Sequence, residues 1–355
     1  DRTFLRNNVG QIEEEMDARN VKILYTYDAL GRVTQKEFID DLVTPFTGFT
    51  GGDIVHQFVY DTCLKGKGKL CQVVDATGTT SFTYNSFGDV LTQQFVGKTG
   101  SSVAGVTLNS SYAYNPTTGQ LTGVTYPSGK TQTLTYGSNG YLSSLAYDGV
   151  SVLNNISWTA WGDIKSWHWA QGAGWVGSNT VSFDYDLDGQ PVEISDQDTR
   201  GLVWDEDGRL IGVTDTLNSN KEQLYEYDAV NQLIQADIGS WGSPQAYTYD
   251  DNGNMLTHQE TTSLNGWQFA YGLTSNKLIT RAPFVGGVLG SSFTPSFDPN
   301  GNMINDGIGL TASYDATNRM ISVNKSPQSA SFGYSALGQR VFKVSSSGTQ
   351  IYMYD

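Results

Sequence analysis

Apolar and polar residues alternate along most of this chain, and a short turn motif interrupts the alternation at regular intervals. Pairs of apolar, mostly aromatic residues two positions apart precede the motif, as in Tyr25/Tyr27, Tyr225/Tyr227 and Tyr247/Tyr249. Residues two apart share one face of a β-strand. An aliphatic pair such as Met255-Leu256 follows the motif and begins the next run. Each unit therefore predicts a strand, a tight turn and a second strand.

The turn motif has an aromatic residue, usually Asp, two variable residues and usually Gly. A type I turn favours Asp, Asn or Ser at its first position and Gly at its fourth, and closing it with a left-handed residue gives a common hairpin loop with a bulge. Asn, which tolerates positive φ best after Gly, replaces Gly in two copies. The positions expected to form these turns are Tyr27, Asp28, Gly31, Tyr84, Gly88, Tyr185, Asp186, Gly189, Trp204, Asp205, Gly208, Tyr227, Asp228, Asn231, Tyr249, Asp250, Gly253, Phe297, Asp298, Gly301, Tyr314, Asp315, Asn318, Tyr334 and Gly338.

The commonest spacing of the motif is about 22 residues, enough for two strands and two turns. A second kind of turn, at Asp17-Ala18-Arg19-Asn20 and Asp75-Ala76-Thr77-Gly78, alternates with the first. We therefore predict an all-β fold of repeated antiparallel β-hairpins in a long twisted ribbon. Composition does not change along the chain, so residues 1–355 are interpreted as a single repeat domain. Because the chain starts at Asp1 without Met and stops where another turn should begin, we interpret it as a fragment of a longer protein.

Composition and charge narrow the class of protein. Of 355 residues, 38% are hydrophobic and 16% charged, with 40 Gly and 20 Tyr, which is typical of a β-protein and not of disorder. The net charge of −15 comes without a basic stripe, so no nucleic-acid partner is expected. No apolar run is long enough to span a membrane.

The two cysteines, Cys63 and Cys71, lie symmetrically about Lys67. A hairpin turning there would place them opposite each other, at a spacing that suits a disulfide. A disulfide is expected if the protein is exported, and two reduced thiols are the alternative. No metal site is expected, because two thiols without nearby His or Cys cannot complete a zinc shell.

Candidate chemistry is sparse. His56, His168 and His258 are far apart in sequence and belong to no recognisable catalytic arrangement, so we predict no catalytic residues, no cofactor and no enzyme. Five tryptophans lie within 18 residues: Trp158, Trp161, Trp167, Trp169 and Trp175. Clustered aromatic residues of this kind either stack on sugar rings or fill a packed interior, and both interpretations stay open.

The unit Tyr-Asp-x-x-Gly-Arg/Asn-aliphatic resembles the Rhs/YD-repeat family, with Tyr27–Val33 and Tyr249–Asn254 as near-ideal copies. The family includes bacterial Rhs polymorphic toxins, the B and C components of ABC toxin complexes, and teneurins. The resemblance covers almost the whole chain and implies that the ribbon forms a curved or spiral β-shell wall. In bacterial members the shell encloses a C-terminal toxin domain that an aspartyl-type segment cuts off. Asp298-Pro299-Asn300-Gly301 is similar to the Asp-Pro-x-Gly motif of that segment, but it lies in turn register and more repeats follow it.

The function that this resemblance implies is structural: a shell segment that encapsulates a toxin or effector domain in a secreted, extracellular bacterial Rhs-type toxin. Its expected partners are the remainder of the repeat shell and the C-terminal toxin cargo, with secretion-apparatus or cell-surface components as further candidates. The alternative is an extracellular adhesion module, as in teneurins, that recognises glycans or a protein partner through the Trp-rich segment.

Overall fold

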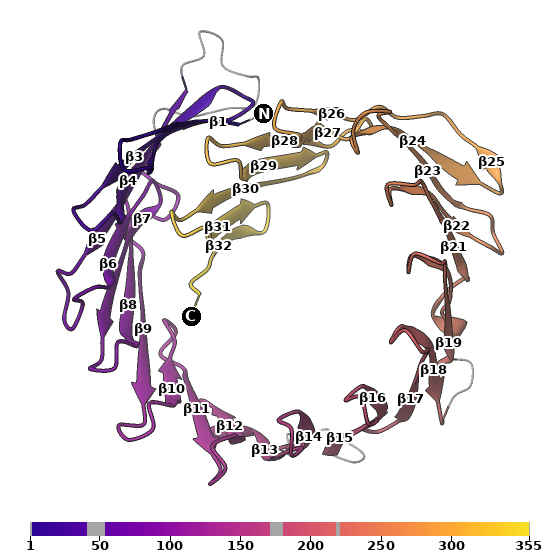
Figure 1. Cartoon of the computed structure of the whole chain (residues 1–355), viewed down its shortest axis with the longest axis horizontal. Coiled ribbons are helices and arrows are strands. Elements are labelled where there is room, and N and C mark those ends of the chain that lie inside the picture. The colour runs from indigo at the N-terminus through magenta and orange to yellow at the C-terminus, as the bar shows by residue number, and fades with distance from the viewer. Residues whose placement is uncertain (1, 41–53, 171–179, 218–220, 355) are drawn as a thin grey trace. The chain divides into compact units, whose positions relative to one another are not determined.

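The computed structural model in Figure 1 describes residues 2–40, 54–170, 180–217 and 221–354. Regular structure in these ranges is β-strand, apart from one 3-10 turn at Gly239–Trp241. None of the described residues forms a helix long and apolar enough to cross a membrane. The described strands belong to two antiparallel sheets, one of 25 strands and one of seven. The prediction of an all-β fold built from repeated antiparallel hairpins is confirmed.

The chain divides into two compact units. Unit 1 comprises Asp1–Lys130 and Pro295–Asp355, and unit 2 comprises Thr131–Thr294. Within each sheet, the strands pair with their neighbours along the chain, as β2 with β3 and β21 with β22 show.

In unit 1 the N-terminal strands pair consecutively from β1 to β10, and the C-terminal strands β26 to β32 form the seven-stranded sheet. Their bounds are β1 Thr3–Arg6, β2 Ile12–Met16, β3 Val21–Tyr27, β4 Val33–Asp40, β5 Ile54–Tyr60, β6 Leu70–Val74, β7 Gly78–Tyr84, β8 Val90–Gly97, β9 Thr107–Tyr114, β10 Leu121–Thr125, β26 Ser296–Phe297, β27 Met303–Asn305, β28 Thr311–Tyr314, β29 Met320–Lys325, β30 Gln328–Tyr334, β31 Arg340–Ser345 and β32 Gly348–Ile351.

Unit 2 repeats the same hairpins from β11 to β25. Its strands are β11 Thr131–Tyr136, β12 Leu142–Tyr147, β13 Val150–Trp158, β14 Ile164–Trp169, β15 Thr180–Tyr185, β16 Pro191–Ser195, β17 Thr199–Trp204, β18 Leu210–Asp215, β19 Gln223–Tyr227, β20 Leu233–Asp237, β21 Gln245–Tyr249, β22 Met255–Glu260, β23 Gly266–Tyr271, β24 Leu278–Val285 and β25 Val288–Leu289.

The turns that carry the sequence motif, here called repeat turns, share one geometry. In the first copy, the Gly31 amide donates to the Asp28 carbonyl and the Asp28 amide donates to the Arg32 carbonyl, both at 3.0 Å. The Asp28 carboxylate accepts the amides of Leu30 and Arg32, both at 2.9 Å. Gly31 has φ +79°, and the strand register shifts by one residue at Tyr27. The Asp side chain thus satisfies backbone donors that the bulged turn leaves unpaired.

The turns at the other ends of the hairpins, here called return turns, also use an Asp side chain. The amides of Arg19 and Thr77 donate to the carboxylates of Asp17 and Asp75, each at 2.8 Å. Successive hairpin turns lie at opposite ends of the strands. The repeat turns therefore lie along one side of the sheet and the return turns along the other.

The two clusters of buried apolar side chains join β26 to β32 with the N-terminal strands of unit 1. One cluster joins Val21 and Phe38 to Ala316, and a second joins Phe95 and Val103 to Val341. Elsewhere most side chains are only half-buried.

Candidate functional site

The aromatic residue that precedes most of the repeat turns connects that repeat to the one before it. The Tyr27 hydroxyl donates to the Ile12 carbonyl at 2.7 Å, and the Tyr249 hydroxyl donates to the Leu233 carbonyl at 2.8 Å. In each case the acceptor lies two residues after the Gly or Asn that closes the preceding repeat turn. We call this series the aromatic ladder, and its further described hydrogen bonds come from Tyr60, Tyr84, Tyr114, Trp158, Tyr185, Trp204, Tyr227 and Tyr314.

The ladder accounts for the Tyr and Trp residues of the motif, and Phe297 is the exception. Trp158 and Trp204 replace Tyr, and each donates through its indole N–H at 2.8 Å. Phe297 has no polar side-chain atom and cannot donate. Burial raises the pKa of the Tyr114 and Tyr249 hydroxyls, which keeps them protonated as donors. The sequence contained a signal for this role, since Tyr and Trp share a hydrogen-bond donor that Phe lacks.

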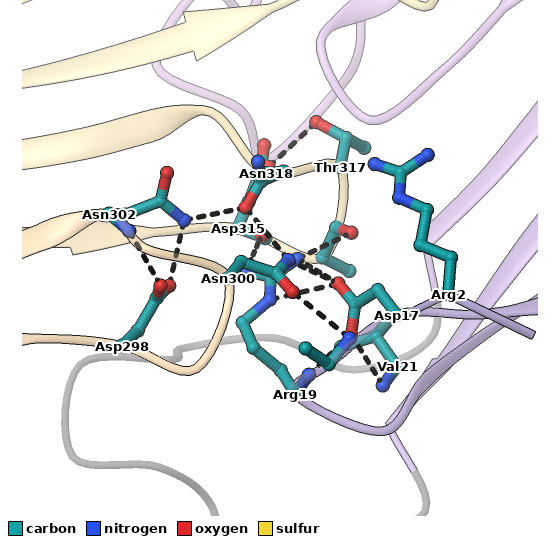
Figure 2. A network of polar contacts seen from close by, with 12 residues as sticks. Arg2, Asp17, Arg19, Val21, Asp298, Asn300, Asn302, Asp315, Thr317 and Asn318 are labelled. Atoms are coloured by element: carbon teal, nitrogen blue, oxygen red, sulfur yellow. Dashed lines mark hydrogen bonds and ion pairs between the residues drawn. The ribbon is translucent and has the colours of Figure 1, made fainter. Parts of the chain in front are cut away.

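A second set of contacts joins the return turns of β2–β3 and β6–β7 to the repeat turns of the seven-stranded sheet, and we call it the seam. Figure 2 shows its first contact. The Asp17 carboxylate accepts Arg19 at 2.7 Å and the Asn300 side chain at 2.6 Å. The Ala18 amide donates to the Asn300 side chain at 3.0 Å. Arg19 also donates to the Asp315 and Ala316 carbonyls, at 2.8 and 3.2 Å.

This first contact buries a charged pair completely. The side chains of Asp17 and Arg19 are each 6% exposed. Burial alone would raise the pKa of Asp17, but the hydrogen bonds from Arg19, Asn300 and the Val21 amide, together with the charge of Arg19, hold the pKa below its usual value. A buried ion pair is stable only when its remaining donors and acceptors are satisfied, and here carbonyls from the opposing turn satisfy Arg19.

The second contact uses the same kind of return turn without an arginine. One oxygen of Asp75 accepts the Thr77 amide at 2.8 Å, and the other accepts the Ala336 amide at 2.7 Å. The repeat turn of Ala336 begins with Ser335, where most repeat turns have Asp. An Asp at 335 would bring a second carboxylate toward buried Asp75, with Thr77 in the place that Arg19 takes in the first contact. Like charges near each other are destabilising, and the serine avoids this repulsion.

A cavity of about 310 Å³ lies in the seam, lined by His56, Thr77, Ser101, Asp315, Arg319 and Phe342, among others. The His56 ring is 5% exposed and contacts Phe38 edge-to-face at 5.0 Å. Burial lowers the pKa of His56; Asp75 and Asp315 oppose this effect, while Arg319 and Lys36 add to it. The cavity therefore favours the neutral imidazole.

The structure places Cys63 and Cys71 in a disulfide with a Cα–Cα distance of 5.4 Å. Gly66 lies over the bridge, where a Cβ atom would come within 2.2 and 2.5 Å of the two sulfur atoms. This loop can therefore accept only glycine at 66 without rearrangement.

The described tryptophans of this segment have different surroundings. Trp158 belongs to the aromatic ladder, and Trp161 is 64% exposed in a repeat turn. Trp167 contacts Trp169 at 6.1 Å and Phe183 at 5.4 Å between ring centres. Trp175 lies outside the described residues.

No family model matches the sequence, and no curated protein sequence matches it. Solved structures with the same fold do exist. The crystal structure of TcdB2-TccC3 is similar with a TM-score of 0.75 and 17% identity, over 97% of this chain and 20% of that chain. The TcdB2-TccC3-TEV structure gives 0.74 and 17%, over 99% and 20%.

The Tc holotoxin pore of Photorhabdus luminescens is similar with a TM-score of 0.74 and 17% identity, over 96% of this chain and 19% of that chain. The chain thus spans about a fifth of the length of these structures. At this level of identity the likeness concerns the fold alone. The chain has the fold of one segment of the TcdB2-TccC3 structures, which supports the ABC-toxin resemblance at the level of architecture.

Proposed function

We propose that this chain is a structural segment of the β-shell wall of a secreted Rhs-type toxin, and that the shell encloses a C-terminal toxin or effector polypeptide. The segment acts without catalysis or cofactor. Its partners are the remainder of the shell and the enclosed cargo. The observation that carries the proposal is the seam, whose turns join residues 261 and 282 positions apart in sequence.

A β-shell wall has two structural requirements. A wall must hold a large sheet together without a thick core, and the aromatic ladder does so by connecting each repeat to the preceding one. A wall must also close between stretches that are distant in the chain, and the seam closes such a gap with hydrogen bonds and two apolar clusters. The likeness in fold to toxin-complex structures supports the same interpretation.

The seam also offers a precise way to test containment. Ala336→Pro removes the amide that donates to Asp75, yet Pro suits the second position of a type I turn and already stands there at Pro116 and Pro299. The matched control is Ala29→Pro, at the same position of the exposed repeat turn of Asp28. The two variants differ in whether the turn is part of the seam.

The experiment measures protease resistance of the cargo in the complete toxin that carries this chain. We expect the cargo to resist protease in the wild type and in Ala29→Pro, and to be degraded faster in Ala336→Pro. A cargo that is equally accessible in all three proteins would refute containment. Equal protection in all three would show that the seam does not close the wall.

A further inference from the structure

Unit 2 contains a cavity of about 500 Å³ on one face of its sheet, at the strand ends that carry the return turns. Its volume falls within the range of about 300–1,000 Å³ that is usual for small-molecule sites. The cavity extends from β14 to β19 and is lined by Trp169, Val181, Asp196, Gln197, Asp198, Arg200, Val213, Asp215, Lys221 and Gln223.

One side of the cavity is aromatic and aliphatic. Trp167 and Trp169 are two positions apart on β14, so they share a face of the sheet, and Val181 pairs directly with Trp167 across β14 and β15. The edge-to-face contact at 6.1 Å with Trp167 supports the Trp169 ring. This arrangement gives the cavity a supported apolar surface.

The opposite side is rich in hydrogen-bonding groups whose charges are balanced by neighbours. Arg200 contacts Asp196 at 2.8 Å, and Lys221 lies 3.4 Å from Asp198 and 3.9 Å from Asp215. The side chains of Gln197 and Gln223 add amide groups, and the Gln223 side-chain carbonyl oxygen also accepts the Tyr225 hydroxyl. This side of the cavity therefore offers both hydrogen-bond donors and acceptors without a strong charge of either sign.

These two sides fit a ligand with an apolar face and a polar rim. A sugar ring has axial C–H groups that pack on an aromatic ring, and equatorial hydroxyls that both donate and accept. A cationic ligand would compete with Arg200 and Lys221, and an anionic ligand would meet three carboxylates. We propose that this cavity is a binding site for an uncharged saccharide. Trp169 stacks on the sugar ring, and Asp198, Gln197 and Gln223 bind its hydroxyl groups.

The proposal singles out Trp169 among the tryptophans of this segment. Trp158 uses its indole N–H in the aromatic ladder, and Trp161, although 64% exposed, is not among the residues that line the cavity. Trp161 therefore supplies a matched control: an exposed tryptophan close in sequence but outside the proposed site. The saccharide site does not depend on the shell function, and either proposal can fail alone.

The test is saturation-transfer NMR and a glycan array on the purified 355-residue chain, with uncharged mono- and oligosaccharides as probes. We expect saturable binding by the wild type and by Trp161→Ala. Trp169→Ala should weaken binding by about tenfold or more, because it removes the stacking surface. Gln197→Ala, an exposed position that does not threaten folding, should weaken binding less.

Three results would overturn the proposal. The first is no binding of any uncharged saccharide by a chain whose hydrogen exchange shows unit 2 folded. The second is binding that Trp169→Ala and Gln197→Ala leave unchanged, since the sugar would then sit elsewhere. The third is self-association of the chain that Trp169→Ala abolishes without any sugar binding, which would make this face a protein interface.

Discussion

Units 1 and 2 are built from the same hairpins but are held together in different ways. Both have repeat turns and the aromatic ladder, as Tyr27 in unit 1 and Tyr249 in unit 2 show. Among the described residues, both clusters of buried hydrophobic side chains belong to unit 1, where strands distant in sequence meet in the seam. The ladder and the turns are thus sufficient to build a sheet, and the seam is an additional device that joins distant stretches.

This difference has a thermodynamic consequence. The stability of an array of repeats is approximately a sum of repeat and nearest-neighbour contributions. A substitution in unit 2 should therefore loosen the repeats beside it, whereas a substitution in the seam should weaken β2, β3 and the seven-stranded sheet together. Hydrogen exchange measured peptide by peptide distinguishes these two patterns.

The largest loss of folding stability is expected from Asp17→Ala. Removing this carboxylate leaves Arg19 buried without its charged partner, which costs about 3–5 kcal/mol in comparable sites. Amide exchange should accelerate in β2, β3, β28 and β29, and the strands of unit 2 should be unaffected. Asp228→Ala is the control, because it removes the corresponding side chain of a repeat turn in unit 2. Unchanged exchange in β28 and β29 of Asp17→Ala would contradict the seam.

The same comparison shows how far the sequence determines the structure. The hairpins follow from residues within one motif: Asp28 and Gly31 act within five residues of each other, so the pattern alone predicts their turn. The seam does not follow in this way, because Asp17 and Asn300 are ordinary turn residues whose partnership depends on how distant strands meet. The aromatic ladder lies between these cases, since Tyr-or-Trp selection was visible but its acceptor, the carbonyl of the preceding repeat, was not.

The candidate site residues show the same limit to what the sequence predicts. The spacing of Cys63 and Cys71 predicted their proximity, although the expected hairpin about Lys67 is not present: Cys63 lies in the connection between β5 and β6, and Cys71 lies on β6. The five tryptophans were grouped by sequence distance, but alternation along β13 and β14 and the turn between them gives Trp158, Trp161 and Trp169 different surroundings. Position within one hairpin can be predicted from the sequence, whereas the choice of partner across hairpins cannot.

A second, smaller loss of folding stability is expected from substitutions in the repeat turns. Gly253 has φ +82°, and a Cβ atom there would lie 3.1 Å from the flexible amide end of Gln232. Backbone strain is therefore the main cost of a larger residue, and Gly253→Val should destabilise its hairpin by about 1–3 kcal/mol. Gly253→Asn should cost clearly less, since Asn231 and Asn318 both have φ +68° in the same turn position.

The Gly253 variants are compared by chemical denaturation and by exchange in β21 and β22. Equal losses for Val and Asn would mean that positive φ is not what the glycine provides. Because Gly253 lies in unit 2, the loss should stay within the adjacent hairpins, in contrast to the effect of Asp17→Ala.

The aromatic ladder predicts a third effect, of about 1 kcal/mol for each hydrogen bond. Tyr249→Phe removes the hydroxyl that donates to the Leu233 carbonyl and should cost about that amount. Tyr249→Trp should retain more stability than Tyr249→Phe, because Trp158 and Trp204 make the corresponding contact through indole N–H groups. A Phe variant as stable as the wild type would show that the ladder hydrogen bonds contribute nothing measurable.

The smallest effect concerns pH and is specific to unit 1. Burial holds the pKa of His56 below its ordinary value of 6.5 in the folded state. Between that value and the lowered one, the unfolded chain binds more protons than the folded chain, so unit 1 is most stable above about pH 6.5 and loses stability as the pH falls. The lowered pKa of Asp17 acts in the same direction only below 3.8.

His56 is therefore the group of the seam expected to respond between pH 7 and pH 5, in the field of Asp75, Asp315, Arg319 and Lys36. Exchange in β28 to β31 should accelerate on acidification across this range, and His56→Gln should remove that dependence while keeping a polar side chain beside Phe38. Slower exchange at pH 5 than at pH 7, or an unchanged dependence in His56→Gln, would exclude this residue as the cause. If the dependence follows His56, the contact that joins distant strands is also the part of unit 1 that mild acid weakens, since residues of the return turn of Asp75 and the repeat turn of Asp315 line the cavity of His56.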